Sequence, residues 1–349
     1  GSFAPDRPGA NPADERAESL RTFRWNMDML VQQLVAAAEP RPTLVLVTPT
    51  AYDETAQLTA TNLVGLNHAL GEASRLLTRV ARKHRAHLVD LHTPTTELNR
   101  MGQAVDATFS LSAPDRMHPN SVGHLAAAYH YLKAQGVGGG ISSFAIDGTT
   151  GEIKQADRGR ILNLDARPGE LAFDCEEHAL PWPIAPDAAP ALAWLPGLAE
   201  LNQQKLAIHF ADAGRYAFTI DGERVGEFTA AELRAGIDLA RLRTPQARQA
   251  QQLLAALEQR RVANFAFRRV AQVRTMLQSA KIDARDTAAV EAYFAKRLPE
   301  RPDYFQALFA DYRATLPRLA ALREEFEASA EALRQLNRPT PHRYRFERM

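Results

Sequence analysis

Amphipathic and continuously apolar segments alternate along the first third of the chain. Residues 15–39 carry apolar side chains at helical spacing, at Leu20, Phe23, Met27, Leu30 and Leu34. Two short apolar runs, at residues 43–48 (TLVLVT) and 87–91 (HLVDL), are typical of strands buried on both faces of a parallel sheet. The remaining pattern predicts helices at residues 58–84, 93–102 and 119–135. This rhythm favours a three-layer α/β unit, and ligands of such sheets bind where the strands end. The loops at residues 49–53 and 113–119 are therefore expected to meet at that edge.

The pattern changes after Gly136. A glycine-rich joint is followed by short alternating runs, among them residues 205–210, 215–220 and 224–228. Asp221-Gly222 separates the last two runs and predicts a type I′ hairpin turn. Thr229 and Glu232 have the spacing of a capping box that opens a short helix.

The last third of the chain is long, charged and amphipathic. Residues 244–336 predict a helical hairpin in which Pro299 and Pro302 mark the turn. Residues 337–349 are predicted to be a basic tail with interleaved aromatic side chains and a frayed end. The predicted domains are thus an α/β domain at 1–136, a β-rich module at 141–238, the helical region at 244–336 and the tail.

Composition and charge narrow the function classes. The 349 residues are 45% hydrophobic and 24% charged, which excludes a disordered chain. The 42 Lys and Arg nearly balance 41 Asp and Glu, so no global field favours nucleic acid or an anionic membrane. No apolar run approaches the roughly 20 residues that a membrane-spanning helix needs. Cys175 is the single cysteine, which excludes an internal disulfide and a cysteine-based zinc cluster.

The clearest chemical pattern is Asp115-Arg116-Met117-His118-Pro119, which is followed by Gly123 and an apolar helix. Histidine is the general base that ester hydrolysis near neutral pH requires, and a carboxylate three residues earlier can bond its Nδ1 side. Two other interpretations remain open. Asp115 can be a helix cap beside a surface histidine, or Asp115 and His118 can bind a metal together with His124.

The order of these segments resembles the SGNH/GDSL hydrolase family, serine esterases and lipases built on a flavodoxin-like α/β sandwich. In that family a strand ending in Thr-Pro precedes the catalytic block Asp-x-x-His-Pro-x-x-x-Gly, represented here by Asp115, His118, Pro119 and Gly123. The resemblance implies that Asp115 orients His118, the general base, without a metal or cofactor. It also implies that Tyr52 and Asp53 lie in a substrate-binding loop, and that the substrate is a small-molecule or carbohydrate ester.

The later segments are similar to an extended bacterial branch of the same family. The resemblance is carried by residues 217–240 and by the start of the helical region, TPQARQAQ. In this branch a β module and helices follow the catalytic domain, and members of the family are often exported. The resemblance therefore implies a partial flavodoxin-like sandwich, a small β-rich module and a C-terminal helical hairpin.

The family's first blocks are missing from their expected place. Gly-Asp-Ser, the glycine block and Gly-x-Asn-Asp do not occur ahead of Leu44. Gly9-Ala10-Asn11 has the letters of the oxyanion block, but Pro12 replaces its aspartate and no strand precedes it; no strand presents Ser2 either. The nucleophilic serine and the oxyanion donors are therefore expected upstream of this chain, which by itself should be inactive.

A second function class stays open, that of a non-catalytic protein which binds a polymer or a partner on a degenerate SGNH-like scaffold. Other residues also have two interpretations. Asp90 and His92 at a strand end are either functional or a loop cap. Trp182 and Trp194 are either packing anchors or a platform on which a sugar stacks.

Overall fold

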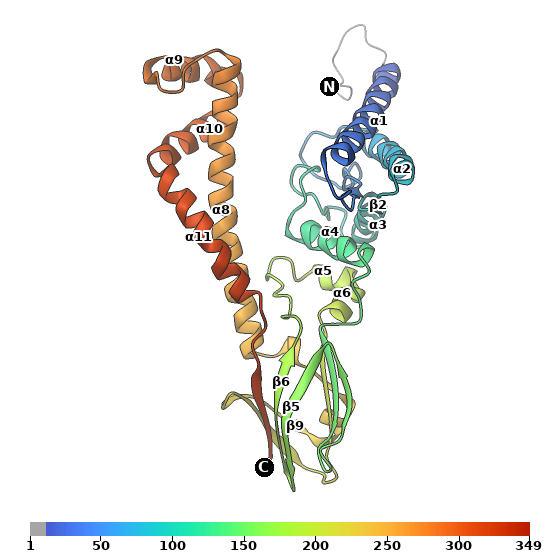
Figure 1. The fold of residues 1–349 in the computed structure, drawn as a ribbon. Helices are drawn as coiled ribbons and strands as arrows, with labels where there is room; N and C mark the ends of the chain where they lie inside the picture. Colours follow the sequence, from blue (N-terminus) through green and yellow to red (C-terminus); the bar gives the residue numbers. More distant parts are fainter. Residues whose placement is uncertain (1–11) are drawn as a thin grey trace. The chain divides into compact units, whose positions relative to one another are not determined.

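The computed structural model describes residues 12–349, which form two compact units, each with helices (Figure 1). Unit 1 contains the described residues up to Gly140 together with Ile184–Asn202. Unit 2 contains Ile141–Pro183 and Gln203–Met349. The chain therefore leaves unit 1, returns to it for one short segment, and then completes unit 2. None of the described helices is long and apolar enough to cross a bilayer.

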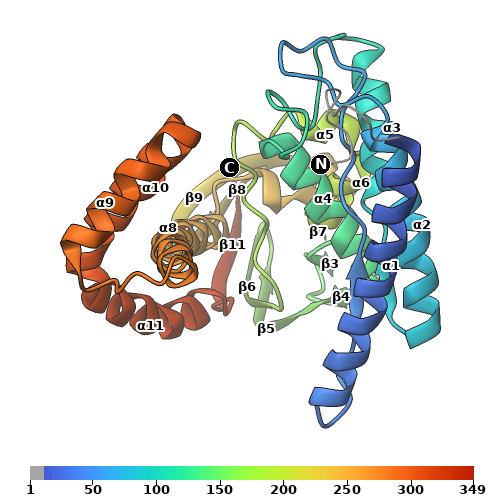
Figure 2. The same cartoon turned by 90° about the horizontal axis from the view of Figure 1, so that it is seen from above.

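Unit 1 is a mixed α/β fold around a short parallel strand pair, β1 and β2, in register from Val45↔His87 to Val47↔Val89. Helices α1 and α2 lie side by side (Figure 2) and bury Val31, Leu77 and Val80 with Leu46 of β1. The elements are α1 (Pro12–Ala37), β1 (Val45–Val47), α2 (Leu66–His84), β2 (His87–Val89), α3 (His92–Gln103), α4 (Ser121–Ala134), α5 (Ala191–Trp194) and α6 (Pro196–Leu201).

Helix α2 begins eight residues later than its apolar pattern predicts. Glu54 explains the shift, because its carboxylate accepts hydrogen bonds from the backbone N–H groups of Gly65 (3.0 Å) and Asn67 (2.5 Å) at the helix start. Gly65 itself has φ 88°, a left-handed conformation that suits glycine. Residues 54–65 are thereby committed to a loop.

Unit 2 contains two sheets. The four-stranded sheet has the order β10-β7-β3-β4 and the five-stranded sheet has the order β5-β6-β11-β8-β9. Only β3 and β7 pair in parallel; the other pairs of the two sheets are antiparallel. The strands and the helix among them are β3 (Ser142–Asp147), β4 (Ile153–Asp157), β5 (Gly159–Arg167), β6 (Glu170–Glu177), β7 (Gln204–His209), β8 (Arg215–Ile220), β9 (Glu223–Thr229), α7 (Ala230–Ala235), β10 (Ile237–Asp238) and β11 (His342–Arg348).

Two local predictions in this unit are confirmed. The hairpin turn between β8 and β9 has φ 52° at Asp221 and 82° at Gly222, the two positive values that a type I′ turn requires. Thr229 and Glu232 form the reciprocal hydrogen bonds of a capping box at the start of α7.

The prediction for the C-terminal tail is wrong. Residues 337–349 are not frayed, because β11 lies in the middle of the five-stranded sheet between β6 and β8. Tyr344 and Phe346 are completely buried, whereas Arg343 and Arg345 alternate with them and form ion pairs at the surface. The alternation of aromatic and basic side chains is thus the period-two pattern of a strand with one buried face.

The helical region is confirmed as helical, with α8 (Pro245–Ser279), α9 (Thr287–Arg297), α10 (Pro302–Thr315) and α11 (Leu319–Leu336). Helix α8 packs against α10 and α11 around a core that includes Val273, Phe294 and Phe309. Residues 280–286 connect α8 to α9, while Pro299 and Pro302 lie where α9 is followed by α10. The two sheets and helices α8 to α11 all belong to unit 2, whereas residues 184–202 belong to unit 1. The two observed units therefore do not follow the predicted domain boundaries.

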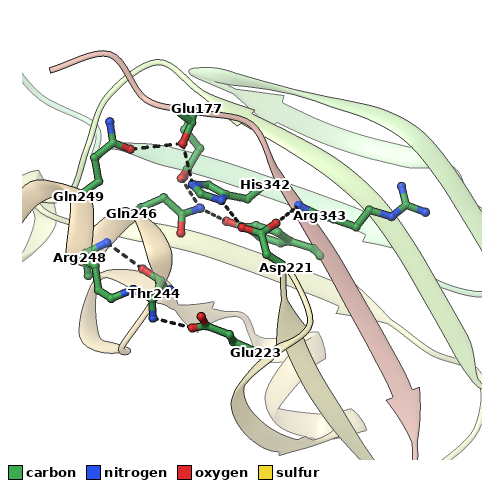
Figure 3. Close-up of polar contacts among 12 residues, drawn as sticks. Glu177, Asp221, Glu223, Thr244, Gln246, Arg248, Gln249, His342 and Arg343 are labelled. Atoms are coloured by element: carbon green, nitrogen blue, oxygen red, sulfur yellow. Dashed lines mark hydrogen bonds and ion pairs between the residues drawn. The ribbon is translucent and has the colours of Figure 1, made fainter. Parts of the chain in front are cut away.

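Polar contacts fix the start of α8 to the sheet (Figure 3). Thr244 caps the helix by accepting a hydrogen bond from the backbone N–H of Ala247 at 3.1 Å. Arg248 forms an ion pair of 2.6 Å with Glu223 of β9. The beginning of β11 is held in the same region, where His342 Nδ1 lies 2.7 Å from an oxygen of Asp221.

Glu177 is a buried carboxylate in this junction. It accepts hydrogen bonds from Ser142, Gln204 and Gln246. Gln246 also donates to the hydroxyl of Tyr344 at 2.6 Å, which connects α8 with β11. Burial raises the pKa of Glu177 above its ordinary value, while these donors act in the opposite direction.

Candidate active site

The loop after β1 and the loop before α4 meet, as their places in the sequence predict. The backbone N–H of Asp53 donates to the carbonyl oxygen of Arg116 at 3.0 Å. The first loop directly follows β1, and this hydrogen bond holds the second loop beside it, at the edge where α/β sheets gather their functional groups.

Arg116 ties the two loops together. Its side chain is buried, and its guanidinium donates to the carbonyl oxygens of Asp53 (3.0 Å), Ala56 (2.9 Å), Leu58 (2.8 Å) and Ala60 (3.1 Å). The backbone of Arg116 has φ 69°, which turns this side chain inward. The amino-acid sequence gives no indication of this role for Arg116. An arginine within a polar motif carries no signal that it is buried, and its four acceptors are main-chain atoms.

Asp115 and His118 point toward each other on the surface of unit 1. Oδ2 of Asp115 lies 2.6 Å from Nδ1 of His118, and Oδ1 accepts hydrogen bonds from the backbone N–H groups of Met117 (3.0 Å) and His118 (2.9 Å). The side chain of His118 is 80% exposed and that of Asp115 is 50% exposed. The ring is thus held through Nδ1, while Nε2 has no hydrogen-bond partner within residues 12–349.

We expect the Asp115 carboxyl to titrate at a pKa of about 2, below its ordinary 3.8, because two backbone N–H groups and the imidazole of His118 stabilise its charged form. The folded pKa is depressed, so this contribution to stability is present above the unfolded value and is lost as the pH falls toward 2. A ¹³C NMR titration of the aspartate carboxyl groups measures the midpoint. In His118→Ala the midpoint should rise, and an unshifted midpoint in the native chain would contradict the hydrogen-bonded geometry.

Asn120 and Gly123 set the position of helix α4 behind this pair. The side chain of Asn120 caps the helix by accepting from the N–H of Gly123 at 3.0 Å and donates to the carbonyl of Ser110 at 2.8 Å. A Cβ on Gly123 would lie 2.2 Å from the carbonyl oxygen of Leu111. The close approach of this backbone explains why a glycine stands at the last position of the block.

Gly123→Ala is accordingly expected to lower the free energy of unfolding by about 2 kcal/mol, because the added methyl group displaces a main-chain segment. Thermal or urea unfolding measures the change. Gly138→Ala is the matched control, since a Cβ at Gly138 meets nothing within 4 Å. Equal stabilities of the two variants would show that the 111–123 contact yields easily.

Tyr52 and Asp53 do not face a substrate. Tyr52 is 3% exposed, and its hydroxyl oxygen accepts a hydrogen bond from the N–H of Leu63 at 2.9 Å. Asp53 is 2% exposed, and its carboxylate accepts from the N–H of Thr55 (3.0 Å) and the side chain of Gln103. Their hydrogen-bonding groups are engaged by the loop and by Gln103 of α3, so the contacts that both residues form here are structural.

The other candidates from the sequence have structural contacts. Asp90 accepts hydrogen bonds from the N–H of Thr93 (3.2 Å) and the hydroxyl of Thr48 (3.1 Å), as a loop cap does. His92 Nε2 lies 3.0 Å from the side-chain oxygen of Asn67. Trp194 packs against Phe109, with ring centroids 5.5 Å apart.

The described part of the chain brings neither a set of metal ligands nor a serine nucleophile to Asp115 and His118. In residues 12–349, no group of three or more His, Cys, Asp or Glu side chains could hold a metal ion. No serine hydroxyl of the same residues forms a hydrogen bond with His118. Ser2 and the Gly9-Ala10-Asn11 block lie outside the described residues.

Comparison with known proteins relates the chain to solved structures. No family model matches it, and no curated protein matches it. A structure described as "BT4096 a gut microbial diltiazem-metabolizing enzyme" has a TM-score of 0.84 and 23% identity, over 98% of this chain and 80% of that one. "LAE5, an alpha/beta hydrolase enzyme from the metagenome of Lake Arreo, Spain" has a TM-score of 0.25 and 24% identity, over 34% of this chain and 47% of that one. The first likeness shows that the chain shares its fold with a known enzyme.

Proposed function

We propose that this chain carries the general base and the orienting carboxylate of a serine ester hydrolase of the SGNH/GDSL type. The observation that carries the proposal is the 2.6 Å contact between Asp115 and His118, exposed beside a pair of parallel strands. A structural role alone would not require the imidazole to stay open to solvent. The shared fold with a diltiazem-metabolizing enzyme favours an enzyme over the alternative of a non-catalytic binding protein.

The geometry defines what each side chain does in the proposed reaction. Because Asp115 holds Nδ1, the free Nε2 of His118 takes the proton from a serine hydroxyl as its oxygen attacks the ester carbonyl. The same nitrogen then gives this proton to the leaving alcohol. In the second half, Nε2 deprotonates the water that attacks the acyl-serine and returns the proton to the serine oxygen. Asp115 remains ionised throughout and stabilises the imidazolium.

The proposal places the serine and the oxyanion donors outside the described residues. Within residues 12–349, strand β1 pairs with β2 on one edge and has no partner strand on the other. A further parallel strand on its other edge would end beside the same loops, where a serine at its carboxyl end could reach His118. The flavodoxin-like layout of the family has this arrangement. The substrate class that we propose is a small acyl ester, including acetylated sugars.

The test is hydrolysis of p-nitrophenyl acetate and of acetylated sugars by two polypeptides. This chain alone should show no turnover, whereas a longer polypeptide that also contains the proposed serine and oxyanion donors should hydrolyse the ester. Turnover by this chain that disappears in His118→Ala would place the nucleophile within the 349 residues. Absence of hydrolysis by the longer polypeptide, together with tight binding of a polymer, would favour the non-catalytic alternative.

A further inference from the structure

A groove with a volume of about 410 Å³ lies between helices α1 and α2 of unit 1, apart from the Asp115–His118 pair. Its walls include Arg21, Arg24, Trp25 and Asp28 from α1, and Arg79 and Lys83 from α2. The α1 residues follow one another at the spacing of a single helix face. Four basic side chains and one acidic side chain therefore face one concave surface, which we call the Trp25 groove.

The positive charge of the Trp25 groove is only partly neutralised. Asp28 is already engaged, because its two oxygens lie 2.7 Å from Lys83 Nζ and 2.7 Å from His84 Nε2. These contacts hold the pKa of Asp28 below its ordinary value, the contact with Lys83 contributing most. Neither Arg24 nor Arg79 forms an ion pair in the part of the chain that the structure describes. Two guanidinium groups are thus available to an incoming anion.

Trp25 adds an apolar surface to this charged groove. Its side chain is 65% exposed, the most exposed of the large aromatic side chains of the described residues. The other two tryptophans differ, since Trp194 packs on Phe109 and Trp182 has a contact within the protein. An indole face beside free guanidinium groups suits a ligand that has both an apolar ring face and a negative charge.

We propose that the Trp25 groove binds a carboxylate-bearing sugar, a uronic acid within an oligosaccharide. The C–H face of one pyranose ring stacks on Trp25, and Arg24 and Arg79 hold the carboxylate, whose planar shape matches the guanidinium fork. The volume of the groove falls in the range of small-ligand sites, about 300–1,000 Å³. Nucleic acid is disfavoured, because the chain has a net charge of only +1. This inference does not depend on the hydrolase proposal.

Isothermal titration of the full 349-residue chain with trigalacturonate at low salt tests the proposal. We expect binding that weakens about tenfold or more in Trp25→Ala and in Arg79→Glu, since each removes one element of recognition. Trp25→Phe should retain part of the affinity. Arg82→Glu is the matched control, because Arg82 is an exposed arginine of α2 that does not line the groove. Circular dichroism verifies that each variant is folded.

Four other outcomes would each overturn the proposal. Equal affinity for neutral cellotriose would remove the role of the carboxylate. If inorganic sulfate competed completely and bound as tightly as the sugar, the groove would be a simple anion site without ring stacking. A loss of binding in Arg82→Glu as large as in Arg79→Glu would reflect overall charge rather than the groove. Absence of any binding at millimolar trigalacturonate would refute the site. His118→Ala should leave the affinity unchanged, which separates this result from the test of hydrolysis.

Discussion

Replacing His118 with alanine is expected to reduce ester hydrolysis by about 10³-fold or more in the polypeptide that, as proposed above, also contains the serine and the oxyanion donors. The expected size follows from general acid–base catalysis, which contributes about 10²–10⁴-fold, and from the loss of activation of the serine. Turnover of p-nitrophenyl acetate measures the loss. The fold should be unaffected, because the side chain is 80% exposed and its ring forms a hydrogen bond with Asp115 alone among the described residues.

The matched control is His124→Ala, which removes another exposed imidazole from the first turns of α4 without touching Asp115. Asp115→Asn tests the effect of the carboxylate on the imidazole of His118 separately from its role in holding the loop. An asparagine oxygen can still accept the N–H groups of Met117 and His118, while its ring contact no longer stabilises the imidazolium. If His118→Ala retained full activity, or if His124→Ala lost as much, His118 would not be the general base.

Phe346→Ala is expected to lower the free energy of unfolding of unit 2 by about 4 kcal/mol, the usual cost of truncating a buried phenylalanine. Phe346 is completely buried in β11 and stacks on Phe218 with ring centroids 4.3 Å apart. Its loss leaves a cavity in the middle of the five-stranded sheet, between β6 and β8. Urea unfolding followed by circular dichroism measures the change.

Arg345→Ala is the control, because Arg345 belongs to the same strand but is exposed and pairs with Glu170 and Glu347 at the surface. Its effect should be within about 1 kcal/mol. If Phe346→Ala also lowered the free energy of unfolding by less than about 1 kcal/mol, β11 would contribute little to the stability of the sheet. Residues 337–349 would then be better described as a tail on the surface of the unit.

The candidate site was partly visible in the sequence. Asp115 and His118 are three residues apart, so the contact between their side chains is local, and the loop before α4 could be placed by the pattern of its neighbours. Tyr52 and Asp53 follow a strand as functional residues often do, yet folding buries both. Position along the chain indicates which edge of a sheet a residue reaches, whereas its direction there depends on the loop around it.

The amino-acid sequence by itself determined the features that rest on neighbouring residues: the strands β1 and β2, the Asp221-Gly222 hairpin, the capping box at Thr229 and the spacing of Asp115 and His118. Tertiary structure decided the features in which distant segments compete for the same hydrogen bonds and the same buried space. Arg116 is committed to carbonyl groups that lie 56–63 residues earlier, and β11 enters a sheet whose other strands end more than 100 residues before it. The local sequence pattern does not show which distant segments become such partners. Whether a polar side chain is buried, or a strand is central, depends on the segments that pack around it after folding.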